Sequence, residues 1–340
     1  MATKYVQIYA TTAQLISDMN SGEKGSSFDG LSERLKEASK AIQGKFGPFI
    51  PVKEIRTFTV DYRIHEDQAL AISPLLEVNS VKVNGVEIRN YALQPSQRRW
   101  PNGPYTMISR EHGFHSEDVV EIDGLWGKYE ELMEIDLTVS QETETKKTMI
   151  VSNGGLISPG MVLLIDDEQE FITCGNGSKG SPAPTLLTSK LNGEIDDVNS
   201  SQIIEIDDGS EVFEDEVIRV ESEDLLIERV SGNSLTVQRG WNQTLITNHA
   251  DDEPLSVYRT YVVLRGVNGT NAAVHNEAAI QEYMVPDDLN YLCRQIAGLM
   301  TMKVRSGFQG RVGNAETGES MYFSEFPPNQ IKFIEENYAL

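Results

Sequence analysis

The chain has 340 residues, 39% of them hydrophobic, so it is long enough for two or three folded domains and too apolar to be disordered. Its formal net charge of −23, from 52 acidic and 29 basic residues, argues against a protein that wraps nucleic acid, because such binding relies on Lys and Arg. It does not exclude a channel through which DNA slides. No membrane span or signal peptide is expected, because the sequence has neither an apolar run of about eighteen residues nor a charged-then-apolar start.

Two helices are expected near the start of the chain. Residues 11–22 predict a short helix that begins at Thr11 or Thr12 and stops at Gly22. Residues 31–45 predict a second helix, because apolar side chains recur on one face at Leu31, Leu35, Ala38 and Ile42.

A compact β unit should follow, up to about residue 136. Its first strand is predicted by alternation at Phe58, Val60, Tyr62 and Ile64. Asn84-Gly85, flanked by valines and isoleucine, is a strong signal for a β-hairpin turn. A later strand is predicted at residues 118–122.

Residues 137–284 read as a separate β-rich module with glycine turns. Within it, residues 194–228 hold fourteen acids and one base, Arg219. Apolar residues such as Ile203, Val217 and Leu225 recur in this stretch, so we expect a folded acidic unit and not a disordered tail.

The same module contains an internal repeat. RGWNQTLITNHA at residues 239–250 matches RGVNGTNAAVHN at residues 265–276, and each copy follows a predicted strand. We expect a structural turn in which Asn and Thr side chains bond nearby backbone and the histidine caps or packs on the loop; a sugar- or metal-binding loop is the alternative. The repeated residues are Arg239, Gly240, Asn242, Thr244 and His249, and Arg265, Gly266, Asn268, Thr270 and His275.

Residues 285–340 predict an amphipathic helix followed by an extended tail. Pro286 suits a helix start, Asp287 and Asp288 suit the first turn, and Lys303 and Arg305 suit the last. Apolar residues share one face of this helix and recur in the tail, and all are candidates for docking to a partner or to the chain's own core: Leu289, Leu292, Ile296, Leu299, Phe323, Phe326, Ile331, Phe333 and Tyr338.

Motifs that carry chemistry are not found. There is no Walker A loop, GxSxG, HExxH or CxxC, so we expect no enzyme, no cofactor and no catalytic residue. His112 and His115 lack a third ligand for zinc, and the acidic clusters at residues 207–209 and 214–216 lack the EF-hand spacing for Ca²⁺. Cys174 and Cys293 lie far apart, and Cys293 falls inside the predicted C-terminal helix, where we expect a small buried thiol; nothing indicates an oxidising compartment.

Two further stretches, residues 30–136 and 285–340, carry motifs in a characteristic order. The first stretch contains Ala38, Ser39, Ile42, Gly47, Phe49, Pro51 and Arg56, then Asn84-Gly85, Trp100-Pro101 and Gly124, Trp126 and Gly127. The second contains the proline-started helix, a glycine-rich reach and the aromatic and proline segment before Tyr338. Together they resemble head–tail connector (adaptor, head-completion) proteins of tailed bacteriophages. That family is usually much shorter, so the resemblance implies that residues 137–284 are an insertion.

The resemblance implies an α+β protein with a helical adaptor core and small β-sheet (1–136), an inserted all-β module (137–284), and an amphipathic C-terminal helix with an extended docking tail (285–340). It implies a structural virion protein of the neck, assembled in the host cytoplasm, that forms a homo-oligomeric ring, typically of about twelve copies. The ring bridges the portal protein to a tail-side neck or tail terminator protein, with the capsid as a further candidate partner. It also lines the DNA channel during ejection, where Lys303, Arg305 and Arg311 are candidates to face the DNA. The alternative is a carbohydrate- or receptor-binding virion protein that acts through the β insert, with Trp241, Tyr258 and Tyr261 as its few aromatics.

Overall fold

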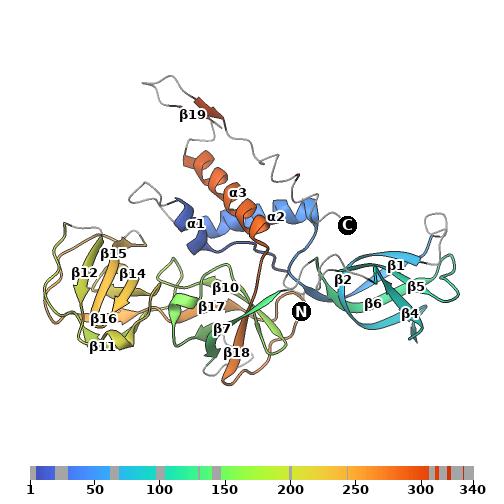
Figure 1. The fold of residues 1–340 in the computed structure, drawn as a ribbon, viewed down its shortest axis with the longest axis horizontal. Coiled ribbons are helices and arrows are strands. Elements are labelled where there is room, and N and C mark those ends of the chain that lie inside the picture. Colours follow the sequence, from blue (N-terminus) through green and yellow to red (C-terminus); the bar gives the residue numbers. More distant parts are fainter. Residues whose placement is uncertain are drawn as a thin grey trace.

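The protein is described here from a computed structural model, in which the placement of residues 5–19, 30–61, 69–96, 104–128, 131–139, 147–198, 201–242, 244–305, 311–313, 320–322 and Lys332 is defined. In this part of the chain, three helices and three six-stranded antiparallel sheets make up the fold. Figure 1 shows the three sheets in a row along the longest axis, with the helices beside the central one. We call the three β units the first sheet, the middle module and the outer module.

The first sheet is built from one continuous stretch of chain. Its strand order is β1-β6-β2-β5-β4, and β3 pairs with β2. The turn between β2 and β3 is the predicted Asn84-Gly85 hairpin, in which both residues have positive φ, 50° and 81°. The bounds are β1 Val52–Thr59, β2 Ala69–Val83, β3 Val86–Ile88, β4 Tyr91–Gln94, β5 Tyr105–Arg110 and β6 Val119–Trp126.

The middle and outer modules divide residues 132–283 between them. The middle module consists of β7 Leu132–Val139, β8 Thr148–Ile150, β9 Val162–Ile165, β10 Glu168–Cys174, β17 Thr260–Leu264 and β18 Ala278–Tyr283, with the 3-10 turn η1 Gly154–Leu156. The outer module consists of β11 Thr185–Lys190, β12 Ser201–Glu205, β13 Val217–Val220, β14 Glu223–Ser231, β15 Ser234–Trp241 and β16 Pro254–Val257, with the 3-10 turn η2 Gly209–Glu211.

These two modules are copies of one fold. The strand order is β7-β18-β9-β10-β17-β8 in the middle module and β11-β16-β13-β14-β15-β12 in the outer module, so every strand has a counterpart in the same place. The outer module is inserted between β10 and β17 of the middle module. The region expected as one β module is therefore a nested pair, and its first strand begins at Leu132.

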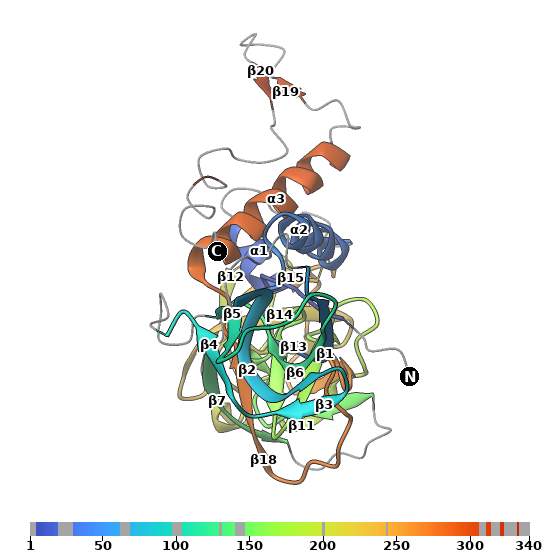
Figure 2. The ribbon, with the colours of Figure 1, turned by 90° about the vertical axis from the view of Figure 1, so that its right-hand side faces the viewer.

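The helices come from both ends of the chain and form one layer. They are α1 Thr12–Met19, α2 Leu31–Phe46 and α3 Asp287–Arg305, which agree with the three predicted helices. Small residues allow α2 and α3 to approach closely: the Ser39 hydroxyl lies 3.4 Å from the Cys293 thiol, in a fully buried contact. Burial raises the pKa of Cys293 to about 11. Figure 2 shows α3 extending beyond the other two helices, toward the hairpin of β19 Arg311–Gly313 and β20 Ser320–Tyr322.

The helical layer packs on the middle module. Val162, Phe171 and Val267 of that module are buried in the same apolar cluster as Leu35 and Ile42 of α2. The first residue of α1 also contacts this module, because the amide of Thr12 donates to the Pro159 carbonyl at 3.1 Å. Full burial of each such apolar side chain contributes roughly 1.5–3 kcal/mol, so this contact fixes the helices to the β structure.

The expected fold class is wrong. In the described residues the protein is mostly β, and the helices form a layer on a β framework and not a helical adaptor core. The "small β-sheet" of residues 1–136 is a six-stranded sheet with its own buried cluster, including Val81, Ile108, Ile122 and Trp126. The physical reason is that β-branched and aromatic residues at period two outweigh the single helical stretch between residues 31 and 136.

Candidate functional site

Each repeated loop is organised around a buried glutamate that lies outside the repeat motif. In the middle module, the Arg265 guanidinium donates to both oxygens of Glu168, at 2.9 and 2.7 Å. In the outer module, Arg239 makes the same two contacts with Glu223, at 2.9 and 2.6 Å. We call Glu168 and Glu223 the anchor glutamates, because each is the first residue of a strand and binds the repeated segment at the end of the partner strand, β17 or β15.

The repeated histidines close the same two clusters. His275 Nδ1 lies 2.8 Å from the Asp166 carboxylate and its Nε2 lies 2.9 Å from that of Glu168. His249 lies in the same way between Glu221 and Glu223, at 2.9 and 2.8 Å. Both imidazole rings are fully buried, so their role in the described structure is to hold two segments together.

The repeated Thr and Asn residues shape the loop and join it to neighbouring units. The hydroxyls of Thr244 and Thr270 each donate to a carbonyl three residues earlier, at 2.8 Å. Asn242 and Asn268 both have a φ of 52°, a left-handed conformation that Asn tolerates. Asn268 Oδ1 accepts from the Val6 amide at 2.7 Å, and Asn242 Nδ2 donates to the Asn176 carbonyl at 2.7 Å. The middle-module loop therefore contacts the N-terminal segment, and the outer-module loop contacts the segment that follows β10 of the middle module.

A metal ion is the natural alternative for such a cluster. Carboxylate oxygens of Glu168 and Glu170 and a ring nitrogen of His275 lie within 4.8 Å of one another. The Arg265 guanidinium, however, is paired with both carboxylates. Burial would raise the pKa of Glu168, but hydrogen bonds from Arg265, the Ala273 amide and His275 outweigh it and lower that pKa. The positive charge that a metal would bring is thus already supplied by the chain.

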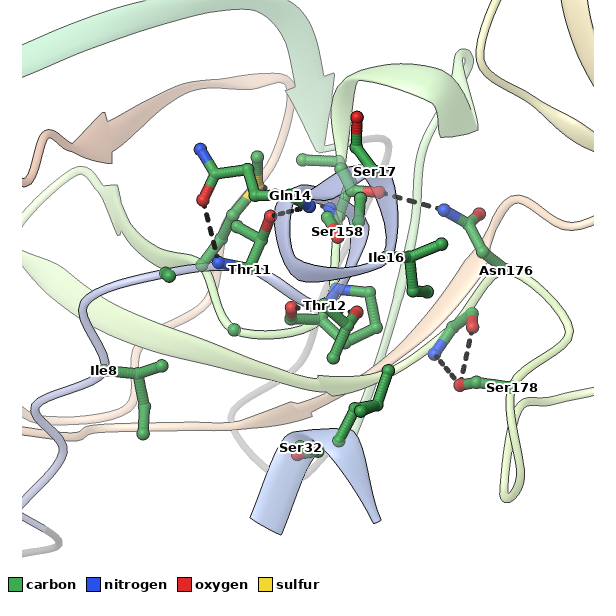
Figure 3. A pocket seen from close by; sticks show the side chains of 18 of the residues that line it. Ile8, Thr11, Thr12, Gln14, Ile16, Ser17, Ser32, Ser158, Asn176 and Ser178 are labelled. Carbon is green, nitrogen blue, oxygen red and sulfur yellow. Dashed lines mark hydrogen bonds between the residues drawn. The ribbon is translucent and has the colours of Figure 1, made fainter. Parts of the chain in front are cut away.

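A groove of about 1530 Å³ lies between the helical layer, the middle module and the outer module. Figure 3 shows its inner wall, where Ile8, Thr11 and Gln14 come from the N-terminal segment and α1, and Ser158 and Asn176 come from the middle module. The Thr11 hydroxyl accepts from the Gln14 amide at 3.2 Å and caps the start of α1. Leu226 and Trp241 of the outer module form part of the opposite wall.

The described residues that line this groove are mainly apolar and uncharged polar side chains. None of the described residues that line it is a histidine, and its thiol, Cys174, donates to the Gly180 carbonyl at 3.3 Å. Burial raises the pKa of Glu282, which also lines the groove, to about 7. Among the lining residues that the structure describes, no nucleophile is paired with a base, as covalent catalysis would require.

The predicted docking residues divide into two groups. Leu289, Leu292 and Ile296 are buried in the helical layer at 1% exposure or less, so they pack in the chain's own core. Leu299 is half-buried. The tail candidates Phe323, Phe326, Ile331, Phe333 and Tyr338 lie outside the described residues.

For the residues expected to face DNA, the structure gives only the helix or strand to which each belongs. Lys303 and Arg305 fall in the last turn of α3, and Arg311 begins β19. Among the other sequence candidates, Asp208 accepts from the Ser210 amide at 2.9 Å and starts η2, while His115 is exposed and lies 3.6 Å from Asp118.

Sequence reasoning missed the anchor glutamates. A signal was present, because DDEQEF at residues 166–171 and ESEDLL at residues 221–226 occupy the same positions in the two modules. Only a glutamate at the third position is shared by both, so the match is too weak to detect without the strand order.

No family model, curated protein or solved structure matches this chain. No helix among the described residues is long and apolar enough to cross a membrane.

Proposed function

We propose that the chain is a structural subunit of a phage head–tail connector, which forms a ring between the portal and the tail of the virion. The observation that carries the proposal is where the fold places the two stretches that resemble adaptor proteins. Residues 30–136 and 285–340 are far apart in sequence, yet α2 and α3 pack against each other around Ser39 and Cys293. Helices from the two adaptor-like stretches therefore pack together in one helical layer, which rests on the middle module, while residues 52–126 form the first sheet with a core of its own.

The design of the β units also supports a structural role. Buried ion clusters, and not an exposed set of catalytic groups, occupy the repeated loops of the middle and outer modules. The same loops carry the contacts to neighbouring units through Asn242 and Asn268. A subunit that must hold a fixed shape in an assembly benefits from such paired and hydrogen-bonded contacts.

The alternative, a sugar-binding insert, loses part of its support. Of its three aromatics, Tyr258 and Tyr261 are buried, and their hydroxyls bond Asp224, and Gly154 and Asn176, respectively. Only Trp241 lines the groove. A carbohydrate site usually stacks sugar rings on accessible aromatic faces, and two of these three faces are not accessible.

The test is portal binding by a tail truncation. Removing residues 320–340 should abolish docking to the portal ring while leaving the three β units and the helical layer folded, because the described core lies between Ile8 and Thr301. Co-sedimentation with the portal measures docking, and circular dichroism checks the fold. Normal docking by the truncated protein would contradict the proposed role of the tail.

A further inference from the structure

The groove lies beside a face that the middle and outer modules share. In the middle module, Val162 begins β9, Phe171 lies three residues after the anchor glutamate, and Val267 follows the Arg-Gly pair. All three are buried against the helical layer, at 3% exposure or less. This face of the middle module is therefore the surface on which helices pack.

The outer module has the same face. Val217 begins β13, Leu226 lies three residues after its anchor glutamate, and Trp241 follows its Arg-Gly pair. Among the described residues, these counterparts are not part of the apolar cluster of the helical layer; all three line the groove, where Val217 is buried and Leu226 and Trp241 are partly buried. The duplication thus provides two helix-packing faces, and the chain's own helices cover the first.

The volume of the groove indicates how large a molecule it can bind. Pockets for small molecules measure roughly 300–1,000 Å³, and the groove, at about 1530 Å³, exceeds that range. It is also continuous with an existing protein contact, because α1 and the segment before it form its opposite wall. A helix from another protein molecule fits these two observations better than a small ligand.

The chain itself offers a helix surface of matching chemistry. Tyr291 and Met302 of α3 are 46% and 45% exposed, and they fall on one face of the helix with Gly298 between them. A Cβ atom at Gly298 would meet no atom within 4 Å, so this face is open. We call Tyr291, Gly298 and Met302 the α3 stripe.

Charge favours the same pairing. The last turn of α3 carries Lys303 and Arg305, and the outer-module side of the groove carries Asp215 and Glu228, both exposed. The surrounding stretch of the outer module is also strongly acidic. Opposite charge across an interface steers association and sets its register.

We propose that the groove of one copy binds the α3 stripe of a second copy. The contact joins different surfaces on the two molecules, so it is heterologous, and repeated contacts of this kind close into a ring when the rotation between neighbouring copies closes, or otherwise extend into a filament. The inference rests on the proposed connector function for the meaning of that ring, but the contact itself requires no portal.

The test uses one defect on each side of the contact. Trp241→Ala damages the groove and Met302→Glu damages the stripe, and each should weaken self-association of the full chain by about tenfold or more, as expected for a central interface residue. Mixed together, the two variants should form a dimer and no larger species, because only one intact groove and one intact stripe can meet. Sedimentation velocity measures all three solutions. Ile203→Ser is the matched control, since Ile203 is a 67% exposed apolar residue of the same module that does not line the groove.

The outcomes separate the inference from the proposed function. Dimer formation in the mixture also proves that both variants are folded, and it supports the inference. A wild-type chain that stays monomeric, a single variant that assembles normally, or a mixture that stays monomeric overturns it. None of these results bears on portal docking by monomers. The proposed connector function is therefore tested separately, by portal binding.

Discussion

Replacing the anchor glutamate of the outer module by glutamine should loosen that module selectively. Glu223 Oε1 accepts from Arg239 Nε and the Gly240 amide, and Oε2 accepts from Arg239 Nη2 and the Thr247 amide and lies 2.8 Å from His249 Nε2. Glutamine offers one oxygen and one amino group. In either orientation of the glutamine side chain, its amino group would face at least two N–H groups that donate hydrogen bonds to the Glu223 carboxylate in the wild-type protein.

The magnitude follows from these lost contacts. A buried donor left without an acceptor costs about 1–3 kcal/mol, and removing one partner of a buried ion pair costs about 3–5 kcal/mol. We therefore expect Glu223→Gln to lower the free energy of unfolding of the outer module by about 3–5 kcal/mol. Glu221→Gln is the matched control, because the Glu221 side chain is 51% exposed and its contact with His249 should be worth at most about 1 kcal/mol.

Hydrogen exchange measured by mass spectrometry reads out the effect module by module. A single melting temperature is not suitable, since a chain with several β units need not unfold in one step. Amides of β13 to β15 should lose protection in Glu223→Gln, while those of the first sheet keep it. Equal protection in Glu223→Gln and Glu221→Gln would refute the idea that the buried cluster holds the loop.

Three further predictions follow from the same contacts. Acid should destabilise both modules, because the pKa of each anchor glutamate is lowered in the folded protein. The stability that each glutamate contributes is present above its ordinary pKa of 4.5 and is lost as the pH falls through its pKa in the folded protein. Urea unfolding at a series of pH values measures this loss. Gly269→Ala should destabilise the contact between the middle module and the first sheet, because its φ is 86° and a Cβ would lie 1.7 Å from the Lys53 carbonyl oxygen. Gly44→Ala, in open space within α2, should instead be stabilising by about 0.5–1 kcal/mol. Hydrogen exchange measures both, and unchanged protection around Lys53 in Gly269→Ala together with lost protection of α2 in Gly44→Ala would contradict the packing. Alkylation followed by peptide mapping should label Cys174 first, since Cys293 is fully buried and its pKa is raised; equal rates would show that the helical layer opens readily.

Local sequence patterns were sufficient where a single element determines them. The faces of the α2 and α3 helices follow from apolar spacing at Leu35, Ile42, Leu292 and Ile296, and the Asn84-Gly85 turn follows from the backbone conformation it requires. The RGxNxT repeat was visible because the residues that shape a tight loop have few substitutes.

The balance of helix and strand was not predictable in the same way. The resemblance to adaptor proteins gave too much weight to the few helical segments, whereas the fold depends on pairing between strands that are distant in the chain, such as β7 with β18. The nested insertion also places the two halves of the middle module on either side of the outer module, which conceals the duplication. The anchor glutamates were missed for that reason, because the arginine that each one binds comes from the end of another strand.

Electron microscopy of the full chain, alone and mixed with the portal ring from the same genome, tests the connector function most directly. The account predicts a ring of the chain stacked on the portal, with the helical layer and C-terminal segment toward the portal and α3 of each copy in the groove of its neighbour. A monomer that does not bind the portal would contradict it.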